Sequence, residues 1–400
     1  MSKVQIKPSE LNGKVIIPPS KSAAHRALIC SFLAGGGNVS PIIESNDMKA
    51  TVGVLESLKN GEKMLDCIES GSTMRFMIPV AAALGRDVTF IGRGSLLPRT
   101  IGEYLELLPK HGVSVESNGF LPLKISGCLE NGSFEVNGDV SSQYITGLLL
   151  ALATLEGDSA VILKTPLQSK PYVNMTVKVM ADYGVKVAET DFGYLIHGGQ
   201  KFKKLDYIVE GDWSHAAFFL VAGAIGGDVT VSGLDMNTTQ GDKAIIDVLE
   251  KFGVEVETGE NSVHVKESRL HGADIDAGNI PDLVPIIAVL AAFSEGKTVI
   301  SGAERLRFKE SDRIKSVVDN LKLMGADVSE TADGMVIHGG KELKAAELKG
   351  YNDHRIVMSF SVAALFLDGM TTIDDAYSIN KSYPEFFDDY NSIGGNADVF

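Results

Sequence analysis

One pattern occurs six times along the chain, and it constrains the fold more than any other feature of the sequence. Each copy begins with polar residues, continues as an apolar run rich in small residues, and meets a glycine-type turn before a β-rich segment. The copies are 20–37, 70–86, 141–157, 212–227, 281–296 and 353–369. Their period is roughly 70 residues, shortened in the first copy, and self-similarity at a fixed period indicates one supersecondary unit per copy.

A second helix with its own glycine stop recurs between these segments. The clearest examples are 105–113, 180–185, 248–254 and 321–326. Helices that alternate with β-rich runs are typical of α/β folds. We therefore expect each copy to consist of strands around two helices, and six such units to make up the whole chain.

Two short segments interrupt this regular order and predict the domain organisation. Glu210-Gly211-Asp212 lacks apolar periodicity and contains a glycine, which is typical of a crossover, and three units lie on each side of it. Pro18-Pro19 separates the first strand-like residues from the first helix. We expect one domain over 19–211 and a second over 1–18 plus 212–400, with crossovers near 18–20 and 210–212. The first strand is then expected to pair with the second domain.

Composition limits the class of protein. A chain of 400 residues with 44% hydrophobic and 22% charged residues is typical of a soluble globular protein. It has no uncharged apolar run of about 18 residues and begins with strand-like alternation, so we expect no membrane span, no signal peptide and a cytoplasmic location. The three scattered cysteines fit a reducing compartment and no metal site, and the net charge of −15 argues against nucleic acid or anionic membrane as partner.

Cations at helix starts give the first indication of function. Pro18-Pro19 fixes an extended approach, Ser20 or Ser22 can cap the helix that follows, and Lys21 and Arg26 lie in its first turns. The N-terminus of a helix is itself partially positive, so cations there are favourable when an anion joins them. The alternative is a solvated helix start with two surface cations.

Further cations stand at or beside other helix starts and loops. These cations are Arg75, Arg99, Arg313, Arg355 and Lys381, and no core role is expected for Arg99, Arg313 or Arg355. Taken singly, each fits a surface residue, and the charged run 305–313 fits a solvated helix start capped by Ser311. Their recurrence predicts instead one anion-binding site where helix N-termini converge.

Together these segments closely resemble the family of 5-enolpyruvylshikimate-3-phosphate synthases (3-phosphoshikimate 1-carboxyvinyltransferases), over almost the whole chain. The most specific segments are Ser20-Lys21-Ser22…Arg26, Ser141-Ser142-Gln143, Ser169-Lys170-Pro171-Tyr172, Glu210-Gly211-Asp212, Lys309-Glu310-Ser311-Asp312-Arg313 and Asn352-Asp353-His354-Arg355. The resemblance implies an α/β fold of two similar domains, each of three βαβαββ units (inverse α/β, a six-fold pseudo-repeat), with the ligand cleft between the domains. It also implies a monomer that needs no metal or organic cofactor.

The resemblance further implies the reaction and the residues that perform it. The enolpyruvyl group of phosphoenolpyruvate passes to the 5-hydroxyl of shikimate 3-phosphate through a tetrahedral ketal, and phosphate is released. The implied catalytic residues are Asp282 as base, Glu310 as acid and Lys21, which shares the proton transfers. The implied ligands of shikimate 3-phosphate are Lys21, Ser22, Arg26, Ser141, Ser142, Gln143, Ser169, Tyr172, Asp282 and Lys309. Those of phosphoenolpyruvate are Lys21, Gly71, Arg99, Gln143, Arg313, Arg355 and Lys381.

The chemistry agrees with these residue types. Both substrates carry phosphate and carboxylate, so several cations must meet in a site from which water is excluded. A base must take the hydroxyl proton, and an acid must protonate the methylene carbon. A carboxylic acid that donates at neutral pH needs a raised pKa, which desolvation in a closed site supplies. The alternatives are purely structural roles: a helix cap for Asp282 and a surface ion pair for Glu310.

Two positions depart from the family pattern. Glu69 stands where family members often carry an asparagine, so we do not assign it as a ligand, although Gly71 keeps the small residue beside it. Arg305 falls where some members carry an asparagine that touches the shikimate phosphate. An arginine is still able to bind phosphate at that position.

Three other functions are compatible with parts of the pattern. The sister enzyme that uses UDP-N-acetylglucosamine carries a cysteine in the loop that reads 92–99 here, where this chain has none, and a Lys-Asn signature in place of Ser-Lys-Ser. RNA 3′-terminal phosphate cyclases use a related repeat, but the acidic balance and the lack of a basic aromatic face argue against them. A non-enzymatic clamp for a phosphorylated metabolite would keep the cations without needing Asp282 and Glu310.

Overall fold

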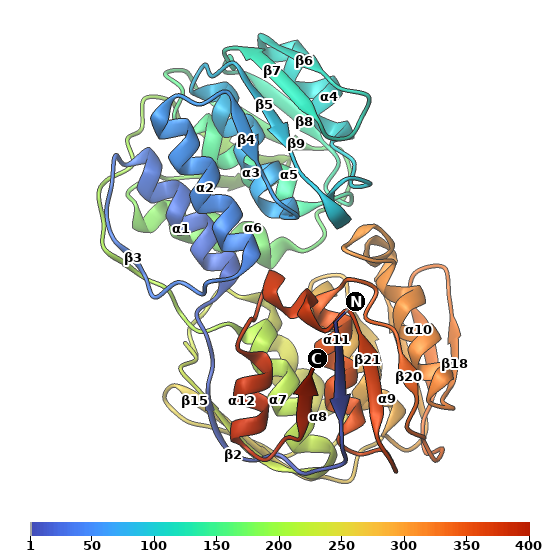
Figure 1. The fold of residues 1–400 in the computed structure, drawn as a ribbon. Coiled ribbons are helices and arrows are strands. Elements are labelled where there is room, and N and C mark those ends of the chain that lie inside the picture. The colour runs from blue at the N-terminus through green and yellow to red at the C-terminus, as the bar shows by residue number, and fades with distance from the viewer. Residues whose placement is uncertain (1) are drawn as a thin grey trace. The chain divides into compact units, whose positions relative to one another are not determined.

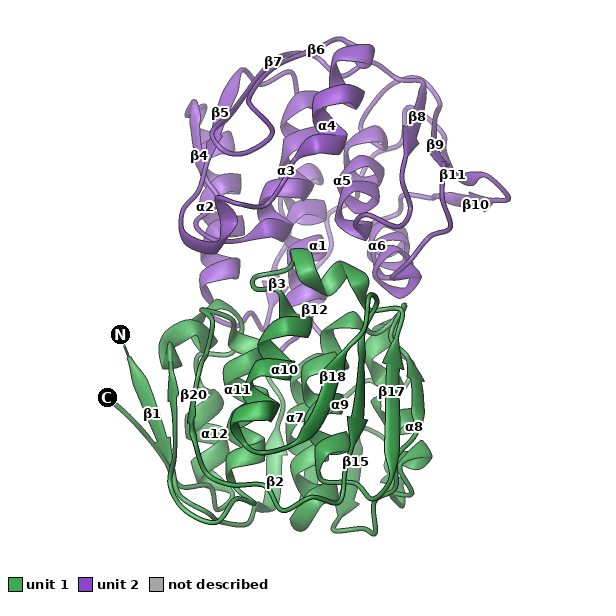
Figure 2. Ribbon diagram, turned by 90° about the vertical axis from the view of Figure 1, so that its right-hand side faces the viewer, with its two compact units in different colours: residues 1–18, 210–400 green, residues 19–209 purple. Residues whose placement is uncertain are grey.

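The fold is described by a computed structural model that covers residues 2–400. The chain divides into two compact units: unit 1 consists of Met1–Pro18 and Glu210–Phe400, and unit 2 of Pro19–Val209. Figure 2 shows the two units in different colours. Within residues 2–400, each unit contains three small sheets.

The first four-stranded sheet of unit 2 has the strand order β4-β5-β7-β6. Its strands are β4 (Met64–Asp66), β5 (Val88–Ile91), β6 (Val113–Glu116) and β7 (Leu123–Gly127). Strands β4 and β5 are parallel, whereas β7 is antiparallel to both β5 and β6. Helices α3 (Gly71–Ala83) and α4 (Gly102–Leu107) separate the strands, so the chain order is βαβαββ.

The second sheet of unit 2 repeats this topology, with the order β10-β11-β9-β8. Its elements are β8 (Ser133–Val136), α5 (Ser142–Leu152), β9 (Ser159–Leu163), α6 (Lys170–Asp182), β10 (Ala188–Thr190) and β11 (Gly193–Ile196). The third sheet is a parallel pair of β3 (Val39–Ser40) and β12 (Tyr207–Ile208), accompanied by α1 (Lys21–Leu33) and α2 (Asn46–Asn60). This two-stranded unit corresponds to the copy that is shortened in sequence.

Unit 1 contains three four-stranded sheets of the same pattern. One is formed by β16 (Asp274–Asp276), α9 (Val284–Ala292), β17 (Lys297–Ser301), α10 (Arg313–Leu323), β18 (Asp327–Glu330) and β19 (Met335–His338). A second is formed by β2 (Asn12–Ile16), α7 (Trp213–Gly226), β13 (Asp228–Ser232), α8 (Ile245–Lys251), β14 (Val256–Thr258) and β15 (Ser262–Lys266). The third is formed by β20 (Glu347–Leu348), α11 (His354–Ala364), β21 (Thr371–Asp374), α12 (Phe386–Ser392), β22 (Ala397–Val399) and β1 (Lys3–Ile6).

The first two strands belong to sheets that the C-terminal half of the chain builds. Strand β1 lies between β21 and β22 and is antiparallel to both, as Figure 1 shows for the dark-blue β1 beside the red β21. Strand β2 runs parallel to β13. The prediction that the first strand pairs with the second half of the chain is therefore confirmed.

The inner helices of unit 1 are almost wholly buried. Helices α7, α9 and α11 pack against one another, and each consists mainly of small and branched apolar residues. Burial of such residues stabilises the fold by about 25 cal/mol for every Å² of apolar surface that is removed from water. These helices therefore form the core against which the sheets pack. Within residues 2–400 no helix has both the length and the apolar character to cross a bilayer.

Side chains at the helix starts satisfy backbone N–H groups that the helix itself leaves unbonded. Ser20 caps α1, Ser70 caps α3 and Ser141 caps α5, while Asp212 and Asp353 cap α7 and α11. Helix α9 differs, because it follows the 3₁₀ turn Pro281–Leu283 and has no side-chain cap.

Candidate functional site

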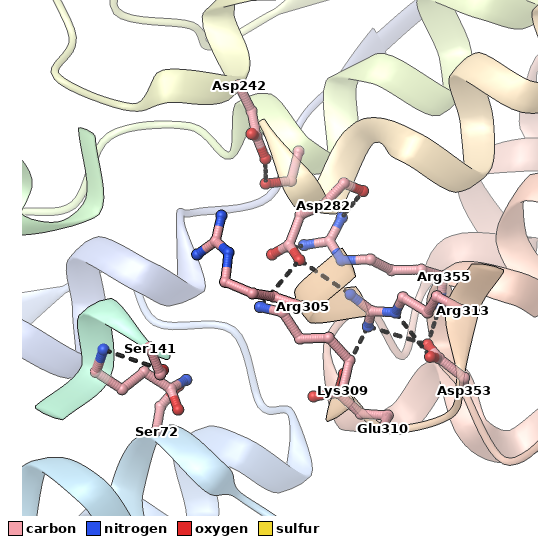
Figure 3. A network of polar contacts seen from close by, with 12 residues as sticks. Ser72, Ser141, Asp242, Asp282, Arg305, Lys309, Glu310, Arg313, Asp353 and Arg355 are labelled. Carbon is pink, nitrogen blue, oxygen red and sulfur yellow. Dashed lines mark hydrogen bonds and ion pairs between the residues drawn. The ribbon is translucent and has the colours of Figure 1, made fainter. Parts of the chain in front are cut away.

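Asp282 lies in the 3₁₀ turn that leads into α9, and it does not cap that helix. Its Oδ1 accepts a hydrogen bond from Arg313 Nη1 over 2.9 Å, and its Oδ2 accepts one from Arg355 Nη2 over 3.1 Å. Lys309 Nζ lies 3.7 Å from the same carboxylate. Asp282 is thus a carboxylate held by three cations and not the helix cap of the alternative reading (Figure 3).

Arg313 is the centre of this network. Its side chain is 1% exposed and pairs with three carboxylates. Besides Asp282, it donates from Nη2 to Glu310 Oε2 over 2.7 Å and from Nε to Asp353 Oδ2 over 2.8 Å. Arg313 begins α10 and Asp353 caps α11, so the guanidinium ties two helix starts to the turn before a third.

The electrostatics of this cluster follow from burial and from the charges around it. Burial works to raise the pKa of Asp282, but Arg355, Lys309 and Arg313 outweigh it and hold that pKa well below its ordinary value. Burial works to lower the pKa of Arg313, and the neighbouring carboxylates, Asp353 foremost, raise it above its ordinary value. Both groups are therefore charged at neutral pH.

Asp242 is a second buried acid of unit 1, and sequence reasoning missed it. It lies in the 3₁₀ turn Gly241–Ala244 and accepts a hydrogen bond from the Ser214 hydroxyl in the first turn of α7. Burial, helped by the charge of Asp282, raises the pKa of Asp242 to about 7. In the view of Figure 3, Asp242 lies above Asp282. A lone aspartate in a polar loop carries no sequence signal for such burial.

Lys381 ends the 3₁₀ segment Ala376–Lys381 and is 5% exposed. Its Nζ donates to the backbone carbonyl of Asn352 over 2.7 Å. Asn352 has φ of 49°, in the left-handed region that asparagine tolerates better than most residues. The contact attaches Lys381 to the residue just before Asp353, at the start of α11.

In unit 2, Lys21 is the first residue of α1. Its Nζ forms an ion pair with Asp47 Oδ2 at 2.7 Å, and both side chains are largely shielded from solvent. Ser20, rather than Ser22, caps the helix. The predicted first-turn cation is thus held by a carboxylate at the start of α2.

Arg26 is a buried link between α1 and α6. Its Nε donates to the Thr176 hydroxyl over 2.8 Å, its Nη2 to the Tyr172 carbonyl over 3.0 Å, and its Nη1 to the Ser22 carbonyl over 2.6 Å. The guanidinium lies over the ring of Phe76. Burial lowers the pKa of Arg26 to about 10, so it remains charged at neutral pH.

Gln143, in the first turn of α5, joins two further helix-start residues. Its Oε1 accepts from Arg75 Nη1 over 2.7 Å, and its Nε2 donates to the Ser72 hydroxyl over 2.9 Å. Its backbone N–H donates to Ser141 Oγ over 3.3 Å, as drawn in Figure 3. Sequence reasoning counted Arg75 among the helix-start cations without assigning it to a substrate, and it gave Ser72 no role. They face Gln143, 68 and 71 residues further along the chain.

Gly71 leaves room for Arg99. A Cβ on Gly71 would overlap the Arg99 guanidinium, so any other residue would displace that side chain. Nearby, Ser142 is buried in the first turn of α5. Ser169 is also buried and precedes α6 with φ of 53°, but it does not cap that helix.

The alternative that three of the arginines are surface residues is wrong. Arg99, Arg313 and Arg355 are 7%, 1% and 5% exposed, so they are buried rather than surface residues. The alternative of a solvated start for α10 is wrong too, because Asp312, not Ser311, caps that helix. The Ser311 hydroxyl instead donates to Asp353 Oδ2 over 3.0 Å.

The described residues contain no group of three or more His, Cys, Asp or Glu side chains that could hold a metal ion. What the two units offer are buried guanidinium and ammonium groups at helix starts, with carboxylates among them. Such groups suit the binding of phosphate and carboxylate anions and the movement of protons.

Comparison with known proteins decides the family. The family model for EPSP synthase (3-phosphoshikimate 1-carboxyvinyltransferase) matches residues 6–65 and 56–390. The chain belongs to the EPSP synthase family. Members of this family with similar sequences include 3-phosphoshikimate 1-carboxyvinyltransferases of Clostridium novyi, 42% identical, and Clostridium kluyveri, 41% identical, each aligned over 100% of this chain and 99% of the relative.

Solved structures of the EPSP synthase family agree with the fold. An EPSP synthase from Acinetobacter baumannii superposes with a TM-score of 0.83 at 28% identity, and the match covers 100% of both chains. The enolpyruvyl transferase NikO from Streptomyces tendae has a TM-score of 0.79 at 16% identity, which is a likeness of fold. The predicted fold class, six βαβαββ-type repeats in an α/β protein, is confirmed, with the first repeat reduced to two strands.

Proposed function

We propose that this chain transfers the enolpyruvyl group of phosphoenolpyruvate to the 5-hydroxyl of shikimate 3-phosphate and releases phosphate. Membership of the EPSP synthase family supports the reaction. The observation that carries it is the position of Asp282, a carboxylate bound by Arg313 and Arg355 in the same buried cluster as Glu310. A metabolite-binding clamp would require the cations but not two acids among them.

The first proposed step is addition. Asp282 takes the proton of the 5-hydroxyl, whose oxygen forms a bond to C2 of phosphoenolpyruvate, while Glu310 gives a proton to the C3 methylene and turns it into a methyl group. The product of this step is a tetrahedral ketal that still carries the phosphate. Lys21 shares these proton transfers.

The second proposed step is elimination. The C2–O bond to phosphate breaks, a proton leaves the C3 methyl group for Glu310, and Asp282 returns its proton to the departing phosphate. The enolpyruvyl double bond is thereby restored on the new ether. Atoms and charges balance without a metal or an organic cofactor, and we propose that none is used.

The proposed phosphoenolpyruvate ligands are mostly the buried cations described above. Lys21, Arg99, Arg313, Arg355 and Lys381 would bind its phosphate and carboxylate, since guanidinium groups match both anions in a bidentate manner. Gly71 and Gln143 complete this set.

The proposed ligands of shikimate 3-phosphate gather at the starts of α1, α5 and α6, with two residues from unit 1. The set is Lys21, Ser22, Arg26, Ser141, Ser142, Gln143, Ser169, Tyr172, Asp282 and Lys309. The hydroxyl and amide groups of the set suit a polyhydroxylated ring, and its cations suit the phosphate. The set includes residues of both units, and we propose that these units are the two predicted domains.

The decisive experiment is a phosphate-release assay of the purified protein. Phosphoenolpyruvate is supplied with shikimate 3-phosphate in one reaction and with UDP-N-acetylglucosamine in another. Release with shikimate 3-phosphate alone supports the proposal, whereas release with the nucleotide sugar alone assigns the sister reaction. Binding of phosphoenolpyruvate without any release would favour the clamp. We also propose that the protein is cytoplasmic, which cell fractionation tests. We propose further that it is a monomer, which sedimentation equilibrium tests.

A further inference from the structure

Glu69 departs from the family pattern, and the proposed mechanism gives it no role. It lies in the loop that follows β4, and the loop that follows the parallel strand β5 runs beside it. Backbone hydrogen bonds from Cys67 to Ile91 (2.9 Å) and from Arg93 to Ile68 (2.7 Å) hold the two loops together. The carboxyl ends of parallel strands are where α/β sheets place their binding loops.

The Glu69 carboxylate binds the second of these loops directly. Its Oε2 accepts from the Ser95 backbone N–H over 2.9 Å and from the Ser95 hydroxyl over 2.8 Å. Ser95 is the middle residue of the 3₁₀ turn Gly94–Leu96, which has no side-chain cap from its own N-cap residue. The first N–H groups of such a turn have no partner within it, so Glu69 supplies the acceptor from another loop.

The turn is shaped to receive this carboxylate. Gly94 has φ of +55°, and a Cβ at that position would overlap the Glu69 carboxyl group. Both the left-handed backbone and the close approach therefore require glycine.

Arg99 is attached to the end of the same turn. Its backbone N–H donates to the Leu96 carbonyl over 3.1 Å, and its guanidinium packs on Gly71, two residues after Glu69. The contacts form a closed ring, from Glu69 to Ser95, through the turn to Arg99, and back to Gly71.

We infer that Glu69 is a positioning residue that fixes Arg99 over Gly71 and thereby sets the affinity for phosphoenolpyruvate. The inference rests on the proposed function, in which Arg99 and Gly71 bind that substrate. In this role Glu69 acts through the loop that carries Ser95 and not on the substrate itself.

The opposite reading makes an opposite prediction. If Glu69 were only a negative charge beside an anion-binding site, its removal would relieve the repulsion between its carboxylate and phosphoenolpyruvate. Phosphoenolpyruvate would then bind more tightly. If Glu69 positions Arg99, its removal weakens binding. The sign of the change in KM separates the two readings.

The experiment measures KM for each substrate in Glu69→Ala, Glu69→Gln and Ser95→Ala. We expect Glu69→Ala to raise KM for phosphoenolpyruvate roughly ten- to a hundred-fold, the effect of losing a charge-assisted contact, with KM for shikimate 3-phosphate within about twofold of wild type. Glu69→Gln keeps one acceptor oxygen and should recover part of the loss. Ser95→Ala keeps the charge but removes one hydrogen bond, so it should weaken binding in the same direction.

Glu116→Ala is the matched control, because it removes an exposed carboxylate of unit 2, at the end of β6, that forms an ion pair with Lys124 on β7. It should leave both KM values unchanged. A lower KM for phosphoenolpyruvate in either Glu69 variant, or equal rises for both substrates, would overturn the inference.

A second readout does not depend on activity. Hydrogen exchange of the segment 94–100, followed by mass spectrometry, should accelerate in Glu69→Ala and Ser95→Ala but not in Glu116→Ala. If the wild type releases no phosphate at all, the proposed function fails while this exchange result still reports on the ring of contacts. Unchanged exchange in both loop variants would overturn the positioning role.

Discussion

Arg313 donates from Nη1 to Oδ1 of Asp282 over 2.9 Å, so the residue proposed to bind phosphoenolpyruvate is bound to the residue proposed as base. Arg355 holds the other carboxylate oxygen. A carboxylate with so low a pKa is a weak base. When the anionic groups of phosphoenolpyruvate draw these guanidinium groups to themselves, Asp282 gains basicity. This coupling would activate the base only when the substrate to be attacked is present.

Replacement of Asp282 by Asn tests this role. We expect turnover to fall roughly 10²- to 10⁴-fold, the contribution of a general base. We also expect a lower melting temperature, since Arg313 and Arg355 lose a buried anion. The comparison is with Asp312→Asn, a helix cap that asparagine replaces well, which should keep near-normal turnover. Turnover of Asp282→Asn close to wild type would remove the residue from the mechanism.

The stability expectation for Asp282 shows what sequence alone could not supply. Its position before a buried apolar helix is compatible with a cap as the alternative to a catalytic role, and Asn would keep most of that capping ability. The actual partners, Arg313 and Arg355, lie 31 and 73 residues away. No local pattern encodes which distant cations will meet a carboxylate, so the burial of these arginines was also misjudged.

The repeat, in contrast, predicted the fold well because its information is local and occurs many times. Five of the six sheets have the same four-stranded topology, and polar residues stand at the expected helix starts. The repeat did not predict the two-stranded sheet of β3 and β12. In this sheet Tyr207 pairs with Val39, and most of the sequence of unit 2 lies between these two residues. Candidate ligands quoted from motifs were located, while the positions of Asp242 and Ser72 and the partner of Arg75 emerged only from tertiary contacts.

Glu310→Gln should separate proton transfer from binding. We expect both substrates to bind with near-normal affinity, because glutamine keeps the shape of the side chain and an acceptor for Arg313 Nη2. Turnover should fall about 10²- to 10⁴-fold, since an amide cannot protonate carbon. The specific measurement is deuterium incorporation at the methylene carbon of the product formed in D₂O, which should fall in parallel. The exposed Glu304→Gln serves as control, and unchanged incorporation in Glu310→Gln would assign the acid elsewhere.

Arg313→Ala should destabilise the fold as well as weaken phosphoenolpyruvate binding. Its removal leaves Asp282, Glu310 and Asp353 close together without their shared cation, and loss of one partner of a buried ion pair costs about 3–5 kcal/mol. Arg307→Ala removes a more exposed cation from the turn before α10, so its effect should stay below about 1 kcal/mol. Thermal unfolding of both variants checks this, and equal melting temperatures would contradict the central role of Arg313.

Asp242 predicts the pH dependence of stability. Its folded-state pKa of about 7 lies above the ordinary value of 3.8, chiefly because of burial and then because of the charge of Asp282. Between these two values the folded state retains a proton that the unfolded state has released, so stability falls as pH rises through this window. Asp282 has the opposite shift, and its contribution is lost only at lower pH, as pH falls through its depressed pKa. As pH rises from about 5 to 7, the ionisation of Asp242 therefore lowers the stability of the fold.

Asp242→Asn should remove this dependence, because the amide does not titrate and can still accept a hydrogen bond from the Ser214 hydroxyl. We expect the melting temperature of the variant, relative to wild type, to rise from pH 5 to pH 8. One proton accounts for at most about 1.4 kcal/mol per pH unit, which limits the size of the effect. Asp247→Asn, an exposed aspartate three residues beyond the same turn, should follow the wild-type profile. If Asp242→Asn also followed it, Asp242 would ionise in the folded protein as it does in the unfolded chain.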